Sequence, residues 1–201
     1  DAGPPVGLAE GRLNGMEGTF LTNREILDLT KFRHLLHRTP EVSGQERETA
    51  ARVAAKLREI GADRVVTDLG GHGVAGVFDG AAPGPTVMLR AELDALPIEE
   101  TGEVDHASTI PGRAHMCGHD GHSAALLGCA CAFARQPPQR GRVVLMFQPA
   151  EEDGSGAAAV IADPRFAELR PDMAFSWHNM PGIPLGEARL REGPMFCASV
   201  G

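Results

Sequence analysis

Residues 142–153 read RVVLMFQPAEED, an apolar run of strand length that breaks at Pro149 and continues into three acidic side chains. Runs of this kind are typical of strands buried on both faces of a parallel sheet. Two more stand at residues 86–90 (TVMLR) and 173–177 (MAFSW), and helical patterns lie between the runs, over 121–135 and 157–162. Strands that alternate with helices predict an α/β fold, in which helices cover both faces of a mostly parallel or mixed sheet.

The first part of the chain carries helix and strand signals of its own. Thr22-Asn-Arg-Glu25 has the form of a capping box, and the helix that it opens should end at Pro40. An apolar stripe predicts a second helix over about 45–60, closed by Gly61. Short strands are expected at 64–67 and 74–78. Residues 1–20 show no periodicity, so we expect a flexible tail there and a folded portion over 21–201.

The composition excludes several classes of function. The chain has 201 residues, of which 42% are hydrophobic and 23% charged, as in globular proteins. Its 19 basic and 27 acidic residues give a net charge of −8, which argues against nucleic acid or an anionic membrane surface as a partner. The longest apolar stretch, residues 124–134, is shorter than the roughly 18 residues that predict a membrane span. We expect a cytoplasmic protein that binds a small molecule and keeps its four cysteines reduced.

Groups that could bind a metal or move a proton follow each of the three apolar runs. In open α/β sheets, ligand sites lie at the carboxyl ends of the strands, so these groups should meet at one edge of the sheet. A further pair, Cys117 and His119, stands directly before the Ala/Leu-rich helix. The segments expected to converge are Glu92 to Asp94, Glu151-Glu152, His178-Asn179 and Cys117-Gly-His119.

The residue types at this edge indicate a divalent cation. A cysteine, histidines and several carboxylates would repel a phosphate, whereas a cation explains why they gather. Cys117 and His119 could flank one ion and His178 could complete its far side, with Glu151 or Glu152 as a further ligand. The neighbouring glutamate would then face the substrate as a general base. A cation that lowers the pKa of water, with a carboxylate to take the proton, can hydrolyse an amide or an ester.

These segments resemble the M20 metallopeptidase family, in its amidohydrolase branch of hippurate hydrolases, N-acyl-amino-acid and indoleacetyl-amino-acid amidohydrolases, and N-acetyldiaminopimelate deacetylases. The sharpest motif is His115-Met-Cys-Gly-His-Asp-Gly-His122. The other motifs stand in family order around it: His37-Arg-Thr-Pro-Glu-Val-Ser43, Leu89-Arg-Ala-Glu-Leu-Asp-Ala-Leu-Pro97, Phe147-Gln-Pro-Ala-Glu-Glu152 and His178-Asn-Met-Pro181, with Gly193-Pro194 near the end.

The resemblance implies a role for each matching position. Cys117 would be a thiolate ligand able to bridge two ions. His119, Glu152 and His178 would be the remaining ligands of one or two ions, for which zinc fits and manganese, cobalt or nickel are alternatives. Glu151 would deprotonate the attacking water and later protonate the leaving amine, and Asp94 would steer the site. Glu92 stands where the branch usually has Asp, and we assign it no role.

The resemblance also implies that residues 21–201 form the N-terminal part of a zinc-peptidase-like catalytic domain. Members of the family are longer, and carry an inserted lid and dimerisation domain followed by a last metal-binding histidine. We therefore expect a fragment that is inactive by itself, taken from an enzyme that forms a homodimer or larger assembly. The expected substrate is an N-acyl amino acid or a similar small amide.

Two other interpretations stay open at the level of sequence. The chain could be a truncated, non-catalytic metal-binding or interaction module, which would take up metal without hydrolysis. It could also be a thiol protein, in which Cys117 would react with alkylating agents equally well with and without metal. Taken alone, Cys117 and His119 could equally be a buried thiol and a surface histidine in a glycine-rich turn.

Overall fold

The computed structural model describes residues 9–11, 20–184 and 186–190, so Gly193, Pro194 and Cys197 lie outside the described part. The chain divides into two units, residues 1–19 with 179–201 and residues 20–178. In the first unit, β1 (Ala9–Gly11) pairs antiparallel with β7 (Ala188–Leu190). The second unit contains the main sheet. Our division of the chain into a tail and a catalytic portion stays a prediction.

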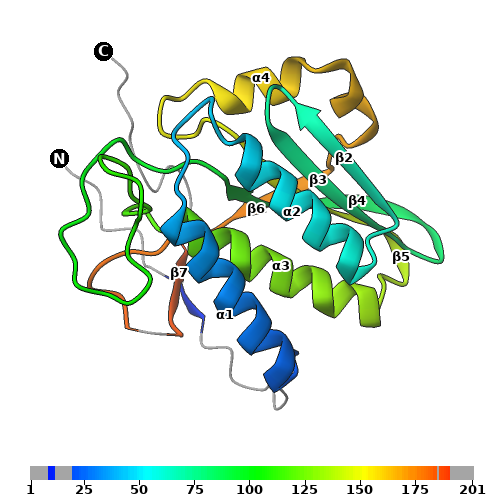
Figure 1. The fold of residues 1–201 in the computed structure, drawn as a ribbon. Helices are drawn as coiled ribbons and strands as arrows, with labels where there is room; N and C mark the ends of the chain where they lie inside the picture. Colours follow the sequence, from blue (N-terminus) through cyan, green and yellow to red (C-terminus); the bar gives the residue numbers. More distant parts are fainter. Residues whose placement is uncertain (1–8, 12–19, 185, 191–201) are drawn as a thin grey trace, which may run out of the picture. The chain divides into compact units, whose positions relative to one another are not determined.

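The main sheet has five strands in the order β2-β3-β5-β4-β6 (Figure 1). The three strands that the apolar runs predict, β4, β5 and β6, are parallel to one another, whereas β2 pairs antiparallel with β3, and β3 with β5. The α/β class with a mixed sheet is therefore confirmed. The strands are β2 (Arg64–Leu69), β3 (Gly73–Asp79), β4 (Ala82–Glu92), β5 (Arg140–Gln148) and β6 (Met173–Ser176).

Helices cover both faces of this sheet, as predicted (Figure 1). On β5, Val143, Leu145 and Phe147 face a core that is shared with three helices, α1 (Asn23–Arg38), α2 (Arg47–Ile60) and α3 (His119–Arg135). Val144 and Met146 face the opposite core, which Val160 of α4 (Gly156–Ala162) joins. Because alternate residues of a strand point to opposite faces, a strand buried on both faces must be apolar throughout.

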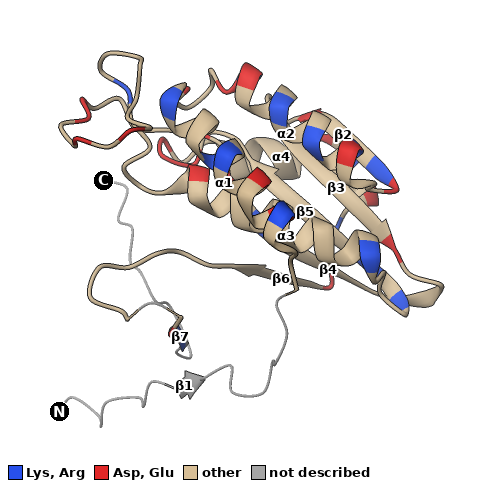
Figure 2. Ribbon diagram, turned by 60° about the horizontal axis from the view of Figure 1, so that its bottom comes forward, with Lys and Arg blue, Asp and Glu red and all other residues tan. Residues whose placement is uncertain are grey.

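Local signals place the helix ends. The capping box of α1 is present, with the Glu25 amide donating to Thr22 Oγ1 at 3.2 Å and the Thr22 amide donating to the Glu25 carboxylate at 2.6 Å. Gly61 ends α2 in the left-handed conformation, with φ of 103°. Basic and acidic residues are interspersed along α1 and α2 (Figure 2). None of the described helices combines the length and apolar composition needed to cross a bilayer.

Topology places the chemistry at one edge of the sheet. Since β4, β5 and β6 are parallel, their carboxyl ends lie at the same edge, and each is followed by polar residues. Helix α3 begins at His119, two residues before the start that the sequence pattern predicts. Its first turn therefore includes part of the motif that precedes the Ala/Leu-rich segment.

Candidate metal centre

His119, the first residue of α3, lies at the centre of the candidate site. Its side chain is buried, and Nδ1 lies 2.8 Å from the backbone oxygen of Asp94. A carbonyl oxygen only accepts, so Nδ1 carries a proton, and in the neutral imidazole Nε2 carries the lone pair. Nε2 has no hydrogen-bond partner among the described residues. An imidazole fixed through one nitrogen, with the other able to coordinate, is the usual arrangement of a metal-ligating histidine.

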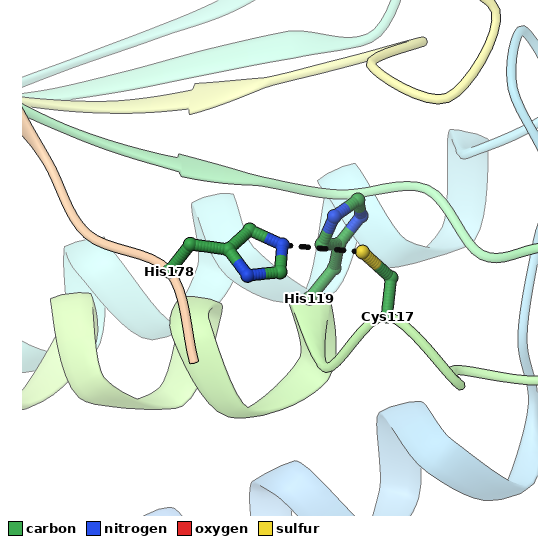
Figure 3. Close-up of side chains that lie close together, drawn as sticks. All are labelled: Cys117, His119 and His178. Carbon is green, nitrogen blue, oxygen red and sulfur yellow. Dashed lines mark hydrogen bonds between the residues drawn. The ribbon is translucent and has the colours of Figure 1, made fainter. Parts of the chain in front are cut away.

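Cys117, two residues before His119 on the same segment, and His178, from the segment after β6, both lie beside His119 (Figure 3). The sulfur of Cys117 lies 3.2 Å from Nε2 of His178, and one donor atom from each of the three residues lies within 4.8 Å of the others. Gly118, with φ of 95°, provides the sharp turn between Cys117 and α3. His178 follows β6, so the parallel pairing of β6 with β4 brings it to the sheet edge.

Glu151 and Glu152 lie next to His119 on the turn that follows β5. Oε2 of Glu151 and Oε1 of Glu152 are each 3.7 Å from Nε2 of His119, so both carboxylates face the same ring nitrogen. Exposure separates them instead. The side chain of Glu151 is 37% exposed and that of Glu152 is 19% exposed, and Oε1 of Glu152 is buried without a hydrogen-bond partner among the described residues.

Asp94 links the segments that bear His119 and Glu152 by hydrogen bonds. It is fully buried, and its Oδ2 accepts hydrogen bonds from Ser43 Oγ at 2.7 Å and from the amide of Glu152 at 2.9 Å. Burial raises the pKa of Asp94, but hydrogen bonds from His119, the Glu152 amide and Ser43 outweigh it and lower the pKa to about 2. A permanently charged Asp94 therefore orients both the imidazole of His119 and the turn that bears the glutamates.

Glu92 and His122, to which the sequence analysis gave no metal-binding role, form a second group around His119. His122 Nδ1 lies 2.8 Å from Oε2 of Glu92, and donor atoms of Glu92, His119 and His122 lie within 4.8 Å of one another. Arg90 forms a salt bridge with Glu92, and Ser123 Oγ donates to its backbone oxygen at 2.8 Å. The fully buried Glu92 is thus part of the site, although it stands at a position where the sequence departs from the amidohydrolase branch.

The charges of this cluster suit a divalent cation. Burial raises the pKa of the Cys117 thiol to about 12, and the carboxylates of Glu152 and Glu151 add to the rise. Burial also raises the pKa of Glu151, partly offset by His119 and reinforced by Glu152. A cation would remove this mutual repulsion and stabilise the thiolate. The buried lone pairs of His119 Nε2 and Glu152 Oε1 therefore fit a metal ion.

The sequence profile of peptidase family M20/M25/M40 matches residues 88–193, more than half of the chain. The chain belongs to this family. It is 42% identical over 171 residues to N-acetyl-L-cysteine deacetylase of Bacillus subtilis, a match that covers 85% of this chain and 40% of the relative. It is 40% identical over 179 residues to hippurate hydrolase of Campylobacter jejuni, covering 87% of this chain and 46% of the relative.

A solved M20 structure shares the fold. The YXEP protein of Bacillus subtilis, described as a dinuclear metal binding peptidase, superposes with a TM-score of 0.75 at 33% identity. The superposition covers 82% of this chain and 45% of that chain. The chain thus spans less than half of the length of these M20 relatives.

The structure brings together Cys117, His119, His178, Glu151 and Glu152, and Asp94 accepts a hydrogen bond from the amide of Glu152. These six residues were predicted from the sequence because each stands next to a strand end or a helix start. The same signal included Glu92, which ends β4 as Gln148 ends β5, and only its departure from the amidohydrolase branch left it without a predicted role. His122 lies in the same motif as His119, and its contacts with Glu92 and with the rings of His119 and His178 place it in the site.

Proposed function

We propose that the protein is a metal-dependent amidohydrolase that cleaves the amide bond of N-acyl amino acids or similar small amides. The observation that carries this proposal is the buried Nε2 of His119, which has no hydrogen-bond partner among the described residues, on a ring fixed by its Nδ1 bond to Asp94 and close to a thiol and two carboxylates. The relatives support the substrate class, since their names include a hippurate hydrolase and an N-acetyl-L-cysteine deacetylase.

Cys117, His119, Glu152 and His178 would hold one or two divalent ions. Zinc suits the sulfur and nitrogen donors, and manganese, cobalt and nickel accept the same set. A cation in this position supplies Lewis acidity, which polarises the substrate carbonyl and lowers the pKa of water. The group Glu92, His119 and His122 provides further donors beside His119.

Glu151 would act as the general base and then as the acid. Its carboxylate is the more exposed of the pair, so substrate and water can reach it while Glu152 stays at the metal. The raised pKa of Glu151 suits a group that takes a proton from water and returns it to the leaving amine. Asp94 would keep the Nε2 lone pair of His119 directed at the ion and hold the amide of Glu152.

Several features of the whole enzyme belong to this proposal. Because the chain spans less than half of its relatives, we propose that residues 21–201 form the N-terminal part of the catalytic domain and hydrolyse little by themselves. A lid and dimerisation domain would complete the enzyme, which would form a homodimer or larger assembly in the cytoplasm. The three described cysteines carry free thiols.

Glu151→Gln and Glu152→Gln, compared in a full-length form, test the assignment. General-base catalysis typically contributes about 10²–10⁴ in rate, so Glu151→Gln should lower hydrolysis of N-acetyl amino acids by that factor and keep its metal. Glu152→Gln should lose bound metal, measured by elemental analysis after dialysis. Metal loss confined to Glu151→Gln would reverse the two roles. A wild-type protein that binds stoichiometric metal but hydrolyses no N-acetyl amino acid would instead support a non-catalytic metal-binding module.

A further inference from the structure

Glu46 is a fully buried carboxylate that the site described above does not use. It stands at the N-cap of α2, yet its side chain makes no capping bond to its own helix. Oε1 of Glu46 instead accepts a hydrogen bond of 2.7 Å from the amide of Ala150, which is 104 residues further along the chain. Glutamate is almost never fully buried unless it is paired, so this contact calls for a structural reason.

Ala150 is held in an unfavourable backbone conformation. Its φ of 47° makes it one of two non-glycine residues with positive φ in the described part of the chain. The left-handed region is costly for alanine because Cβ approaches the next carbonyl oxygen. Such conformations persist only where the surroundings fix them, and they cluster at functional sites. Ala150 directly precedes Glu151 and Glu152.

Two buried carboxylates from different elements hold the turn on either side of Glu151. Glu46, before α2, binds the amide of Ala150, and Asp94, after β4, binds the amide of Glu152. The backbone oxygen of Ala150 accepts a third bond, of 2.9 Å, from the amide of Gly156 at the start of α4. The directions in which the side chains of Glu151 and Glu152 leave the backbone are therefore set by these anchors.

We propose that Glu46 is a positioning residue for the Glu151–Glu152 pair: its bond to Ala150 keeps the turn in the left-handed conformation that presents both carboxylates to His119. The effect on turnover rests on the proposed amidohydrolase function, and the effect on turn geometry does not. A misplacement of about 1 Å can lower a catalytic rate by about 10²-fold, so a remote carboxylate can matter for the chemistry without touching the substrate.

The environment of Glu46 indicates which substitution preserves its role. Burial raises the pKa of Glu46; backbone amides, including that of Ala150, partly offset this, and the charge of Asp94 adds to the rise. The protonated and the charged carboxyl both offer an oxygen to the Ala150 amide. Glutamine keeps that oxygen at the same reach, whereas aspartate withdraws it by one methylene and alanine removes it.

The experiment compares Glu46→Gln, Glu46→Asp and Glu46→Ala. Asp172→Ala is the control for loss of a carboxylate that accepts a backbone amide bond: the exposed Asp172 accepts the Thr86 amide at 2.7 Å, beside the amino end of the apolar part of β4. Three quantities are measured: the amide chemical shift of Ala150, the visible absorption spectrum of the cobalt-loaded chain, and kcat and KM of a full-length form with an N-acetyl amino acid.

We expect Glu46→Ala and Glu46→Asp to shift the Ala150 resonance, to change the cobalt spectrum and to lower kcat by about 10²-fold with KM nearly unchanged. Glu46→Gln and Asp172→Ala should both leave all three quantities at their wild-type values. If Glu46→Ala does not fold, the difference between Glu46→Gln and Glu46→Asp in these three quantities decides whether Glu46 positions the turn. Wild-type spectra and kcat in Glu46→Asp, or losses in Asp172→Ala as large as in Glu46→Asp, would overturn the proposal. Absence of turnover in the wild-type protein would count against the proposed function, and the resonance and the spectrum would still decide the role of Glu46.

Discussion

At the scale of single residues, Asp120 shows how buried polar contacts fix the helix start that bears His119. It follows His119 and is fully buried. Its Oδ2 lies 2.6 Å from Nε of Arg33 and 2.8 Å from Nδ1 of His37, both on α1. From sequence, an acid in the first turn of α3 fits a simple cap equally well. The buried pairing shows instead that α1 anchors the helix start that carries His119.

The same network continues from His37 to Glu100. Nε2 of His37 lies 3.1 Å from Oε1 of Glu100, and the amide of Ser108 donates to Oε2 at 2.7 Å. These bonds attach the segment before Cys117 to the end of α1. The Ser108 amide lowers the pKa of Glu100, burial opposes this shift, and His37 reinforces it.

Glu100→Gln should therefore change how stability depends on pH. A carboxyl group whose pKa is lower in the folded than in the unfolded protein stabilises the fold above its unfolded pKa, and the contribution disappears as pH falls through the folded value. At pH 7 the variant should lose about 1–3 kcal/mol, the range for hydrogen bonds to charged groups. Below the ordinary glutamate pKa of about 4.3, the two free energies of unfolding should converge.

Urea denaturation at several pH values measures this difference. Glu103→Gln, an exposed change in the same loop, is the control and should stay close to wild type at every pH. A Glu100→Gln deficit that is equal at pH 7 and pH 3.5 would contradict the assigned hydrogen bonds.

At the scale of elements, the helices and strands that local sequence signals mark could be predicted best. The capping box before α1, Gly61 after α2 and the apolar runs of β4 to β6 were all found in their places. The extension of β4 back to Ala82 was missed, because Pro83 and Pro85 indicate a turn and only the pairing of Ala82 with Arg140 makes this segment a strand. Strand order and the contact of Glu46 with Ala150 depend on distant segments, which no local pattern specifies.

The junction between β5 and α4 provides a test at this scale. A Cβ placed on Gly156 would lie 1.6 Å from the backbone oxygen of Pro149, so Gly156→Ala must displace the turn that bears the glutamates. We expect a loss of about 2 kcal/mol or more in the free energy of unfolding, as for other overpacked buried positions.

Gly121→Ala is the matched control for thermal or urea unfolding. Gly121 lies in α3, and its added Cβ would meet nothing within 4 Å. Alanine loses less backbone entropy than glycine in a helix, and Gly121 lies in the first turn of α3, so this variant should be at least as stable as wild type. A Gly156→Ala protein as stable as wild type would show that the turn is not packed as described.

At the scale of the whole molecule, a parallel arrangement of three strands explains why residues from four separate segments meet. Chain direction sends the ends of β4, β5 and β6 to one edge, and the turn at Gly118 directs Cys117 and His119 to the same place. The fold class and most of the cluster could thus be predicted from sequence. The pairing of Glu92 with His122 and the contact of Glu46 with Ala150 required the coordinates, because these partners are defined by packing.

X-ray absorption spectroscopy of the zinc-loaded protein tests the central claim, that these side chains surround a common cation. We predict one sulfur neighbour at about 2.3 Å together with nitrogen and oxygen neighbours at about 2.0–2.2 Å. Cys117→Ser should remove the sulfur signal, and Cys131→Ser, a change at a buried core thiol, should leave it intact. A zinc shell without sulfur in the wild-type protein, or a sulfur neighbour that survives Cys117→Ser, would contradict the account.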